Sequence, residues 1–182
     1  MKALKEYIIK FVGLKNGEHE YTFNVGRAFF ESFGYEDYND LDVVVHMTLE
    51  KKSTLMDIHF DIKGDVQVNC DVTNEPFDQD VSADFDLVVK FGDEFNDEEE
   101  DLLILPHGAY EFSVAQYIYE TIVLAIPQKR IHPGVEDGTL QSDILDKLEE
   151  LSLVDQDEHT EQEDIEKTDP RWDALKKLLT DK

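Results

Sequence analysis

Hydrophobic and polar residues alternate along most of the chain between positions 7 and 91, and this alternation predicts β-strands. The pattern is clearest over 56–62, where every second side chain is apolar and Asp57, His59 and Asp61 fall between them. Strands with one apolar and one polar face are typical of antiparallel sheets with one side in water. We therefore expect a mostly antiparallel sheet, and the pattern leaves open whether that sheet closes into a barrel.

Turn residues and charged segments divide this region into separate strands. The predicted strands cover 7–12, 19–23, 43–49, 55–62, 66–72, 81–91 and 102–105. Asn16-Gly17 is a turn signal that predicts a hairpin between the first two of these strands. The polar segment Lys51-Lys52-Ser53 predicts a second hairpin, between the third and the fourth. The segment 93–101 is strongly acidic, and we expect it to be a loop.

Three segments before position 160 have the apolar spacing of helices. The segment 25–33 carries three phenylalanines at helical spacing and ends near Gly34, which predicts a short helix. The best helix is 113–126, where apolar residues recur at steps of three and four and Pro127 ends the pattern. Because this helix is so apolar, we expect it to pack against the sheet. A weaker amphipathic pattern covers 143–153. The fold class is therefore α+β, with one main helix on the sheet.

Apolar residues are dense up to about Ile131 and sparse after it. We predict a sheet-and-helix domain over 1–133, an acidic and largely flexible linker over 134–168, and a short amphipathic helix over 169–182. The linker prediction follows from its composition, since Glu136 to Lys167 contains thirteen acidic residues and two lysines.

The final predicted helix has its own start signals and its own charge. Asp169 is a good capping residue, and Pro170 suits the first helical turn. Trp172 and three leucines form one apolar face, while Lys176 and Lys177 give the segment a mildly basic character. Such a helix either docks on its own domain or anchors a partner.

The net charge of −26 is the most unusual property of the composition. Charge of this sign repels nucleic acid and anionic membranes and attracts basic proteins, although it also serves solubility alone. The single cysteine, Cys70, excludes an internal disulfide and a multi-cysteine zinc site. No segment has the apolar length of a signal peptide or a membrane span, so we expect a cytoplasmic protein.

The residues that carry chemistry do not combine into a catalytic pattern. No nucleophile signature such as G-x-S-x-G is present, and Cys70 falls on the apolar side of its strand, where a cysteine is usually inert. Asp57, His59 and Asp61 share one strand face and are a candidate metal site, yet the same residues are an ordinary wet surface. No glycine-rich phosphate loop precedes a helix. We expect a binding protein without enzymatic activity or cofactor.

Three segments in order resemble one family. The segment 64–77 is similar to a strand ending in C-x-x-C that is followed by an apolar residue, Glu and Pro. The segment 120–127 matches a helix end with the pattern E-x-x-x-L-A-x-P, and 169–172 is like a D-P-R ending. Together, with the acidic linker before the last, these segments resemble the YceD family of large ribosomal RNA subunit accumulation proteins.

The resemblance implies a role in the synthesis, processing or stability of large-subunit ribosomal RNA. The resemblance also brings in four cysteines that many members of the family carry and that could bind zinc. In this chain Cys70 matches the first of these cysteines, Thr73 occupies the second position, and no later pair occurs between His132 and Leu140. One thiol cannot hold a structural zinc ion, so we expect apolar packing around Cys70 and Val72 to replace it.

Charge and resemblance together favour a ribosome biogenesis factor that binds a basic ribosomal protein or a large-subunit precursor. One alternative is an RNA-contacting factor with a local basic patch, although the net charge disfavours direct RNA binding and excludes DNA as an expected partner. Another is an acidic protein-binding module unrelated to ribosomes. The candidate partner-binding residues are Glu75, Pro76, Phe77, Lys129, Arg130, Asp169, Pro170, Arg171, Trp172, Lys176 and Lys177.

Overall fold

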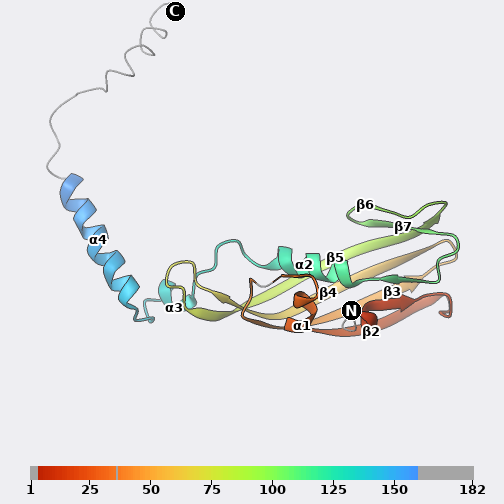
Figure 1. The fold of residues 1–182 in the computed structure, drawn as a ribbon, viewed down its shortest axis with the longest axis horizontal. Helices are drawn as coiled ribbons and strands as arrows, with labels where there is room; N and C mark the ends of the chain where they lie inside the picture. Colours follow the sequence, from red (N-terminus) through yellow and green to blue (C-terminus); the bar gives the residue numbers. More distant parts are fainter. Residues whose placement is uncertain (1–3, 36, 160–182) are drawn as a thin grey trace, which may run out of the picture. The chain divides into compact units, whose positions relative to one another are not determined.

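The computed structural model describes residues 4–35 and 37–159, and the chain divides into two compact units, Met1–Leu140 and Gln141–Lys182. A six-stranded sheet forms the body of the first unit (Figure 1). Its strands, in their order across the sheet, are β2 (Gly17–Gly26), β3 (Asp40–Lys51), β4 (Leu55–Asn69), β5 (Pro76–Gly92), β7 (Leu102–Pro106) and β6 (Asn96–Glu99). A separate two-stranded sheet pairs β1 (Ile8–Lys10) with β8 (Glu111–Ser113).

The six-stranded sheet is mostly antiparallel, as the alternation predicts. Only β5 and β7 run parallel to each other. The predicted hairpin over 43–49 and 55–62 is confirmed as β3 and β4, which pair from Asp40 opposite Gln67 to Lys51 opposite Met56. Within the described residues, β2 and β6 each pair along one edge only. Among these residues, the sheet therefore has two free edges. It does not close into a barrel within the described residues, which answers the question that the sequence pattern did not decide.

The hydrophobic core lies on one face of this sheet, which we call the inner face. On β4 the apolar residues Met56, Ile58 and Phe60 are at most 2% exposed, whereas His59 between them is exposed to solvent. The same alternation runs along β3 and β5. The opposite, polar side is called the outer face. The two-residue period of a strand explains why one pattern places all apolar side chains on one side.

Strand β4 continues through Gly64, where its backbone lies very close to β3. The predicted strands over 55–62 and 66–72 join through this glycine, and the combined strand ends at Asn69. Gly64 lies opposite Val43, and a Cβ atom at Gly64 would lie 2.2 Å from the backbone oxygen of Asp42. No side chain fits in that space, so a glycine is required at this position. The glycine interrupts the alternation of apolar and polar residues, but the strand continues through it.

The main helix, α2 (Ala115–Ala125), confirms the prediction for 113–126 and covers part of the inner face of β5 (Figure 1). Its residues Ile118 and Ile122 are completely buried. A short helix, α1 (Arg27–Glu31), confirms the prediction within 25–33. Phe33, just after α1, stacks on Tyr119 of α2 with ring centroids 4.4 Å apart, which joins the two helices. A 3-10 helix, η1 (Lys5–Tyr7), precedes β1, and α3 (Pro133–Glu136) follows α2.

The predicted first hairpin, between 7–12 and 19–23, is wrong. β1 pairs with β8, more than a hundred positions later in the chain, while β2 pairs with β3 over its full length. The physical reason is burial, because Ile9 and Phe11 are buried and Phe11 packs against Phe91 and Phe112. The segment after β1 is held by Lys51, whose Nζ donates to the backbone oxygen of Phe11 at 2.7 Å.

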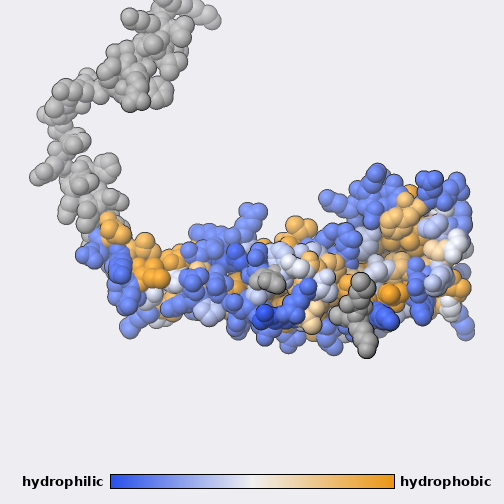
Figure 2. All heavy atoms as spheres, in the orientation of Figure 1, coloured by the Kyte–Doolittle hydropathy of each residue, from blue (hydrophilic) through white to orange (hydrophobic). Residues whose placement is uncertain are grey.

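The sequence predicts that the acidic segment 93–101 is a loop, but the segment also contains strand β6. All four residues of β6 are exposed, and the strand pairs with β7, whose Leu103 and Leu105 are buried. Figure 2 shows hydrophilic residues along this edge, with hydrophobic residues exposed beside them. Charged side chains on an edge strand prevent pairing with other chains. Because these residues are all polar, the segment lacks the apolar alternation by which a strand is predicted from sequence.

The second unit contains helix α4 (Asp143–His159), which begins where the sequence predicts a helix and continues beyond position 153. The flexibility expected of 134–168 stays a prediction. The helix predicted over 169–182 lies outside the described residues. Among the helices of the described chain, none is both long and apolar enough to span a bilayer.

Candidate protein-binding site

A tight loop at Cys70 connects β4 to β5. The backbone N–H of Cys70 donates to the oxygen of Glu75 at 2.9 Å, and the N–H of Asn74 donates to the oxygen of Cys70 at 2.8 Å. Asn74 has a φ angle of 60°, a left-handed conformation that asparagine tolerates better than most residues. These contacts fix the residues just before Pro76, where β5 begins.

The segment after α2 is bound to this loop by a pair of reciprocal contacts. The N–H of Asp71 donates to the backbone oxygen of Arg130 at 2.7 Å, and the N–H of Arg130 donates to a carboxylate oxygen of Asp71, also at 2.7 Å. The rings of Phe77 and His132 meet edge to face with centroids 5.4 Å apart. Five of the predicted partner-binding residues therefore come from two neighbouring segments: Glu75, Pro76, Phe77, Lys129 and Arg130.

These five residues differ in how far a partner can reach them. Phe77 is only 8% exposed and belongs to the core, whereas Pro76 and Lys129 are exposed. Arg130 is partly buried, with its Nε 3.9 Å from a carboxylate oxygen of Asp71. The other six predicted residues, Asp169, Pro170, Arg171, Trp172, Lys176 and Lys177, lie outside the described residues. A binding role for any of the eleven stays a prediction.

The thiol of Cys70 is enclosed by this loop and the segment bound to it. Cys70 is 2% exposed, and its Sγ accepts a hydrogen bond from the N–H of His132 at 3.3 Å. Burial raises the pKa of this thiol, but the hydrogen bonds from His132 and Thr73 outweigh burial and lower the pKa to about 7. The thiol is readily ionised for a cysteine, yet it is shielded from reagents and substrates.

The outer face of the sheet carries rows of carboxylates. Asp42, Asp65 and Asp80 lie side by side on β3, β4 and β5. The carboxyl of Asp65 shares a hydrogen bond with that of Asp80, which raises the pKa of Asp65, and burial and the charge of Asp80 act in the same direction. We call the following set the outer acidic face: Asp42, Asp57, Asp61, Asp65, Asp78, Asp80, Asp84 and Asp86.

The candidate metal ligands of β4 belong to this face and have separate partners. Asp57 pairs with Lys52 at 2.5 Å, and Asp61 pairs with Lys63 at 2.8 Å. The Nδ1 of His59 lies 2.7 Å from a carboxylate oxygen of Asp86. Across the part of the chain that the structure describes, no group of three or more His, Cys, Asp or Glu side chains converges to hold a metal ion.

The comparisons with known proteins assign the chain to one family. The family model for the large ribosomal RNA subunit accumulation protein YceD matches residues 58–179, which is more than half of the chain. The chain belongs to the YceD family. The family description connects it with the accumulation of large-subunit ribosomal RNA. No curated protein and no solved structure matched the chain.

Two of the YceD motifs meet in the fold. The motif at 64–77 forms the end of β4 and the Cys70 loop, and the motif at 120–127 forms the end of α2. Pro127 leads directly to Arg130, which is bound to Asp71 of the loop. This contact joins segments about 60 positions apart, and the sequence pattern gave no signal for it.

The residues present at this contact do not fit a zinc site built on four cysteines. Thr73 stands at the second cysteine position and is 4% exposed. The Nδ1 of His132 accepts a hydrogen bond from the N–H of Gly134 at 2.9 Å. Cys70 is buried and Val72 packs against the core, which is the apolar packing expected around these two residues. Hydrogen bonds between the two segments, which the sequence did not predict, add to this packing.

Proposed function

We propose that this YceD protein supports the accumulation of large-subunit ribosomal RNA by binding a basic ribosomal protein or a pre-ribosomal intermediate. It acts in this proposal by binding and not by catalysis. The proposal combines the family assignment with the charge of the surface, because the family description names the process and the charge indicates the kind of partner.

The observation that carries the proposal is the outer acidic face. Its aspartates occupy neighbouring positions on three long strands, so negative charge is spread over a broad and rigid surface. Only two of its eight aspartates pair with a lysine among the described residues. Ribosomal proteins rich in lysine and arginine are complementary to such a surface. Attraction of this kind accelerates encounter and weakens as salt rises.

Direct RNA binding through a basic patch has less support. The patch would require Lys129 and Arg130 to present their charge together, but Arg130 is partly buried beside the carboxylate of Asp71. The neighbouring acidic surfaces repel phosphate. A protein partner, which then contacts RNA itself, agrees better with these charges.

The test is affinity capture of the tagged full-length protein at low and moderate salt, with identification of the RNA and protein recovered. We expect large-subunit precursors or one basic ribosomal protein, with recovery falling as salt rises. Recovery of the protein alone, or of unrelated metabolic enzymes, would contradict the proposal.

Two matched variants locate the binding surface. The first neutralises three exposed residues of the outer acidic face, by Asp78→Asn, Asp80→Asn and Asp84→Asn. The control neutralises three exposed residues of α4, by Asp143→Asn, Asp146→Asn and Glu150→Gln. The net charge changes equally in both, so loss of the partner from the first variant alone supports the outer acidic face. Equal loss from both would show that total charge decides and that the face has no special role.

A further inference from the structure

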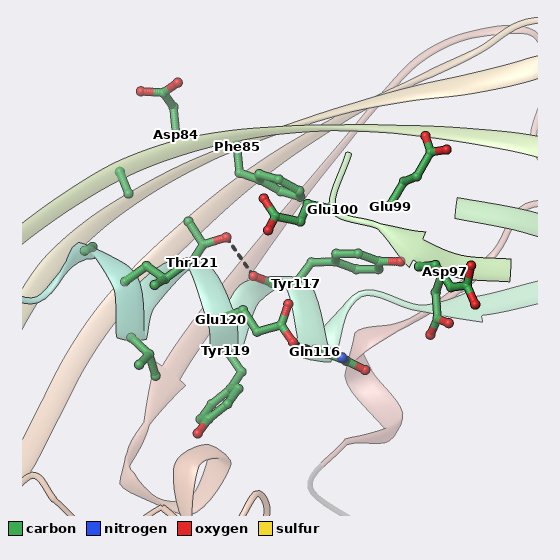
Figure 3. A pocket seen from close by; sticks show the side chains of 15 residues that line it. Asp84, Phe85, Asp97, Glu99, Glu100, Gln116, Tyr117, Tyr119, Glu120 and Thr121 are labelled. Atoms are coloured by element: carbon green, nitrogen blue, oxygen red, sulfur yellow. Dashed lines mark hydrogen bonds between the residues drawn. The ribbon is translucent and has the colours of Figure 1, made fainter. Parts of the chain in front are cut away.

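A groove runs between α2, β5 and β6 on the side of the sheet opposite to the outer acidic face. Its volume is about 680 Å³. Figure 3 shows Phe85 projecting from β5 toward α2 and Tyr117 reaching from α2 toward Asp97, while Asp84 points away on the other side of β5. Asp84 of the outer acidic face is also among the residues that border the groove, so the two surfaces adjoin at β5.

The floor of the groove is apolar and aromatic. Phe85 and Tyr117 stack with ring centroids 6.1 Å apart and an interplanar angle of 15°. Leu124, which also lines the groove, is 84% exposed even though α2 buries Ile122 completely on its other side. Because the partly exposed Phe85 and Tyr117 line the same hollow, Leu124 belongs to a shared apolar surface and is not an isolated exposed residue.

One wall of the groove is acidic and lacks neutralising partners. Asp97, Glu98, Glu99 and Glu100 are consecutive and exposed. Among the described lysines, arginines and histidines, none forms an ion pair with any of them. Their field reaches the floor, since burial, Asp97 and Glu120 together raise the pKa of Tyr117 to about 12. A positive charge at this wall would be stabilised.

The groove is elongated. A second hollow of about 510 Å³ shares Asp97, Gln116 and Tyr117 with it and extends toward Phe95, which is 57% exposed. The two hollows follow α2, whose eleven residues correspond to roughly 16 Å of helix at the usual rise per residue. This length suits a peptide segment with several side chains better than a compact small molecule.

We infer that this groove binds a basic amphipathic segment of a partner protein, with apolar side chains over Phe85, Tyr117 and Leu124 and lysine or arginine side chains against the acidic wall. The inference rests on the proposed function. The outer acidic face attracts a basic partner by charge, and the groove supplies a second contact that makes the choice of partner specific. Helical segments with spaced apolar anchors commonly bind such grooves. A second copy of this chain is a poor occupant, because its net charge of −26 is repelled by the wall.

The direct test measures binding of a dye-labelled synthetic peptide by fluorescence anisotropy. The peptide is an amphipathic helix of about four turns with leucines on one face and lysines on the other. A second peptide carries serine in place of every leucine. We expect the leucine peptide to bind the full-length protein about tenfold more tightly than the serine peptide, because only the leucines use the apolar floor. Equal binding of the two peptides would overturn the inference.

Two pairs of variants locate the peptide on the protein. Leu124→Ser removes the exposed leucine of the groove, and Val12→Ser is its control because Val12 is 64% exposed elsewhere. Glu98→Lys with Glu99→Lys reverses two of the four charges of the acidic wall, both on edge strand β6, and Glu18→Lys with Glu20→Lys makes the same charge change on edge strand β2. We expect each groove variant to weaken binding about tenfold and each control to change it less than about twofold. Equal effects of groove and control variants would overturn the inference, as would displacement of the peptide by spermidine, a small polycation.

The capture experiment separates this inference from the proposed function. If the unchanged protein recovers a basic ribosomal protein and the groove variants recover as much of it, the groove is not a docking site and the proposed function stands. If the unchanged protein recovers no ribosomal component but binds the leucine peptide in the groove, the groove is a docking site and the proposed function fails.

Discussion

Gly64 has the tightest backbone packing of the glycines in the chain. A Cβ at this position would lie 2.2 Å from the oxygen of Asp42 and 2.6 Å from the Cα of Val43. We expect Gly64→Ala to lower the free energy of unfolding by about 3 kcal/mol, because β3 and β4 must separate to accept the methyl group. Urea unfolding measures the change. The control, Gly13→Ala, has no atom within 4 Å of the added Cβ and is expected to change stability by less than about 0.5 kcal/mol. An equally mild effect at Gly64 would contradict the packing described.

The thiol of Cys70 makes stability depend on pH. Its pKa is about 7 in the folded protein and 9.0 ordinarily, so between these values the unfolded chain binds more protons. The free energy of unfolding therefore rises with pH across this range, and the contribution disappears as pH falls below 7. We expect the difference in stability between the unchanged protein and Cys70→Ala to grow from pH 7 to pH 9 in urea unfolding. A difference independent of pH would mean that the N–H groups of His132 and Thr73 do not stabilise the thiolate.

At the scale of residues, the sequence predicted where Cys70 points but not what touches it. Period-two alternation placed it on the apolar side of a strand; it is buried, but in the loop that follows β4. Its hydrogen bond from His132 joins positions 62 apart in the chain. Such contacts depend on how the elements pack, and no local pattern encodes them. The same reason explains why the link between Asp71 and Arg130 was not predicted.

Helix α2 has one buried side and one side that lines the groove, and its residues contribute accordingly. Ile118→Ala removes a completely buried side chain and is expected to lower the free energy of unfolding by about 3 kcal/mol. Leu124→Ala affects a side chain that is 84% exposed, and we expect it to change the free energy of unfolding by less than about 0.5 kcal/mol. Thermal or urea unfolding of both variants checks this. A large loss for Leu124→Ala would show that this leucine supports the fold and is not free for a partner.

At the scale of elements, long periodic segments were predictable and short or charged ones were not. The pairing of β3 with β4 follows from the periodic segments 43–49 and 55–62, and the helix α2 follows from the pattern over 113–126. β1 has three residues, too few for local sequence to decide between β2 and β8 as its partner. β6 consists of asparagine and acidic residues, and its strand conformation comes from pairing with β7 and not from its own propensity.

The whole molecule carries 43 acidic residues against 17 lysines and arginines, so the folded chain repels itself. Salt screens this repulsion more strongly in the compact state than in the unfolded chain. We expect the free energy of unfolding to rise by about 1 kcal/mol when sodium chloride is increased from low to moderate concentration. The variant with Asp78→Asn, Asp80→Asn and Asp84→Asn should gain less, because part of the repulsion is already removed. Stability that falls with salt in both proteins would indicate that ion pairs dominate over repulsion.

The central claim is that the outer acidic face of this YceD protein is needed for the accumulation of large-subunit ribosomal RNA. The most direct measurement is the ratio of large-subunit to small-subunit ribosomal RNA in cells that lack the gene and receive either the unchanged protein or the variant with Asp78→Asn, Asp80→Asn and Asp84→Asn. We predict that loss of the gene lowers the ratio, that the unchanged protein restores it, and that the variant, present at the same level and folded, does not. Full restoration by the variant would contradict the account, because ribosomal RNA would then accumulate without the outer acidic face.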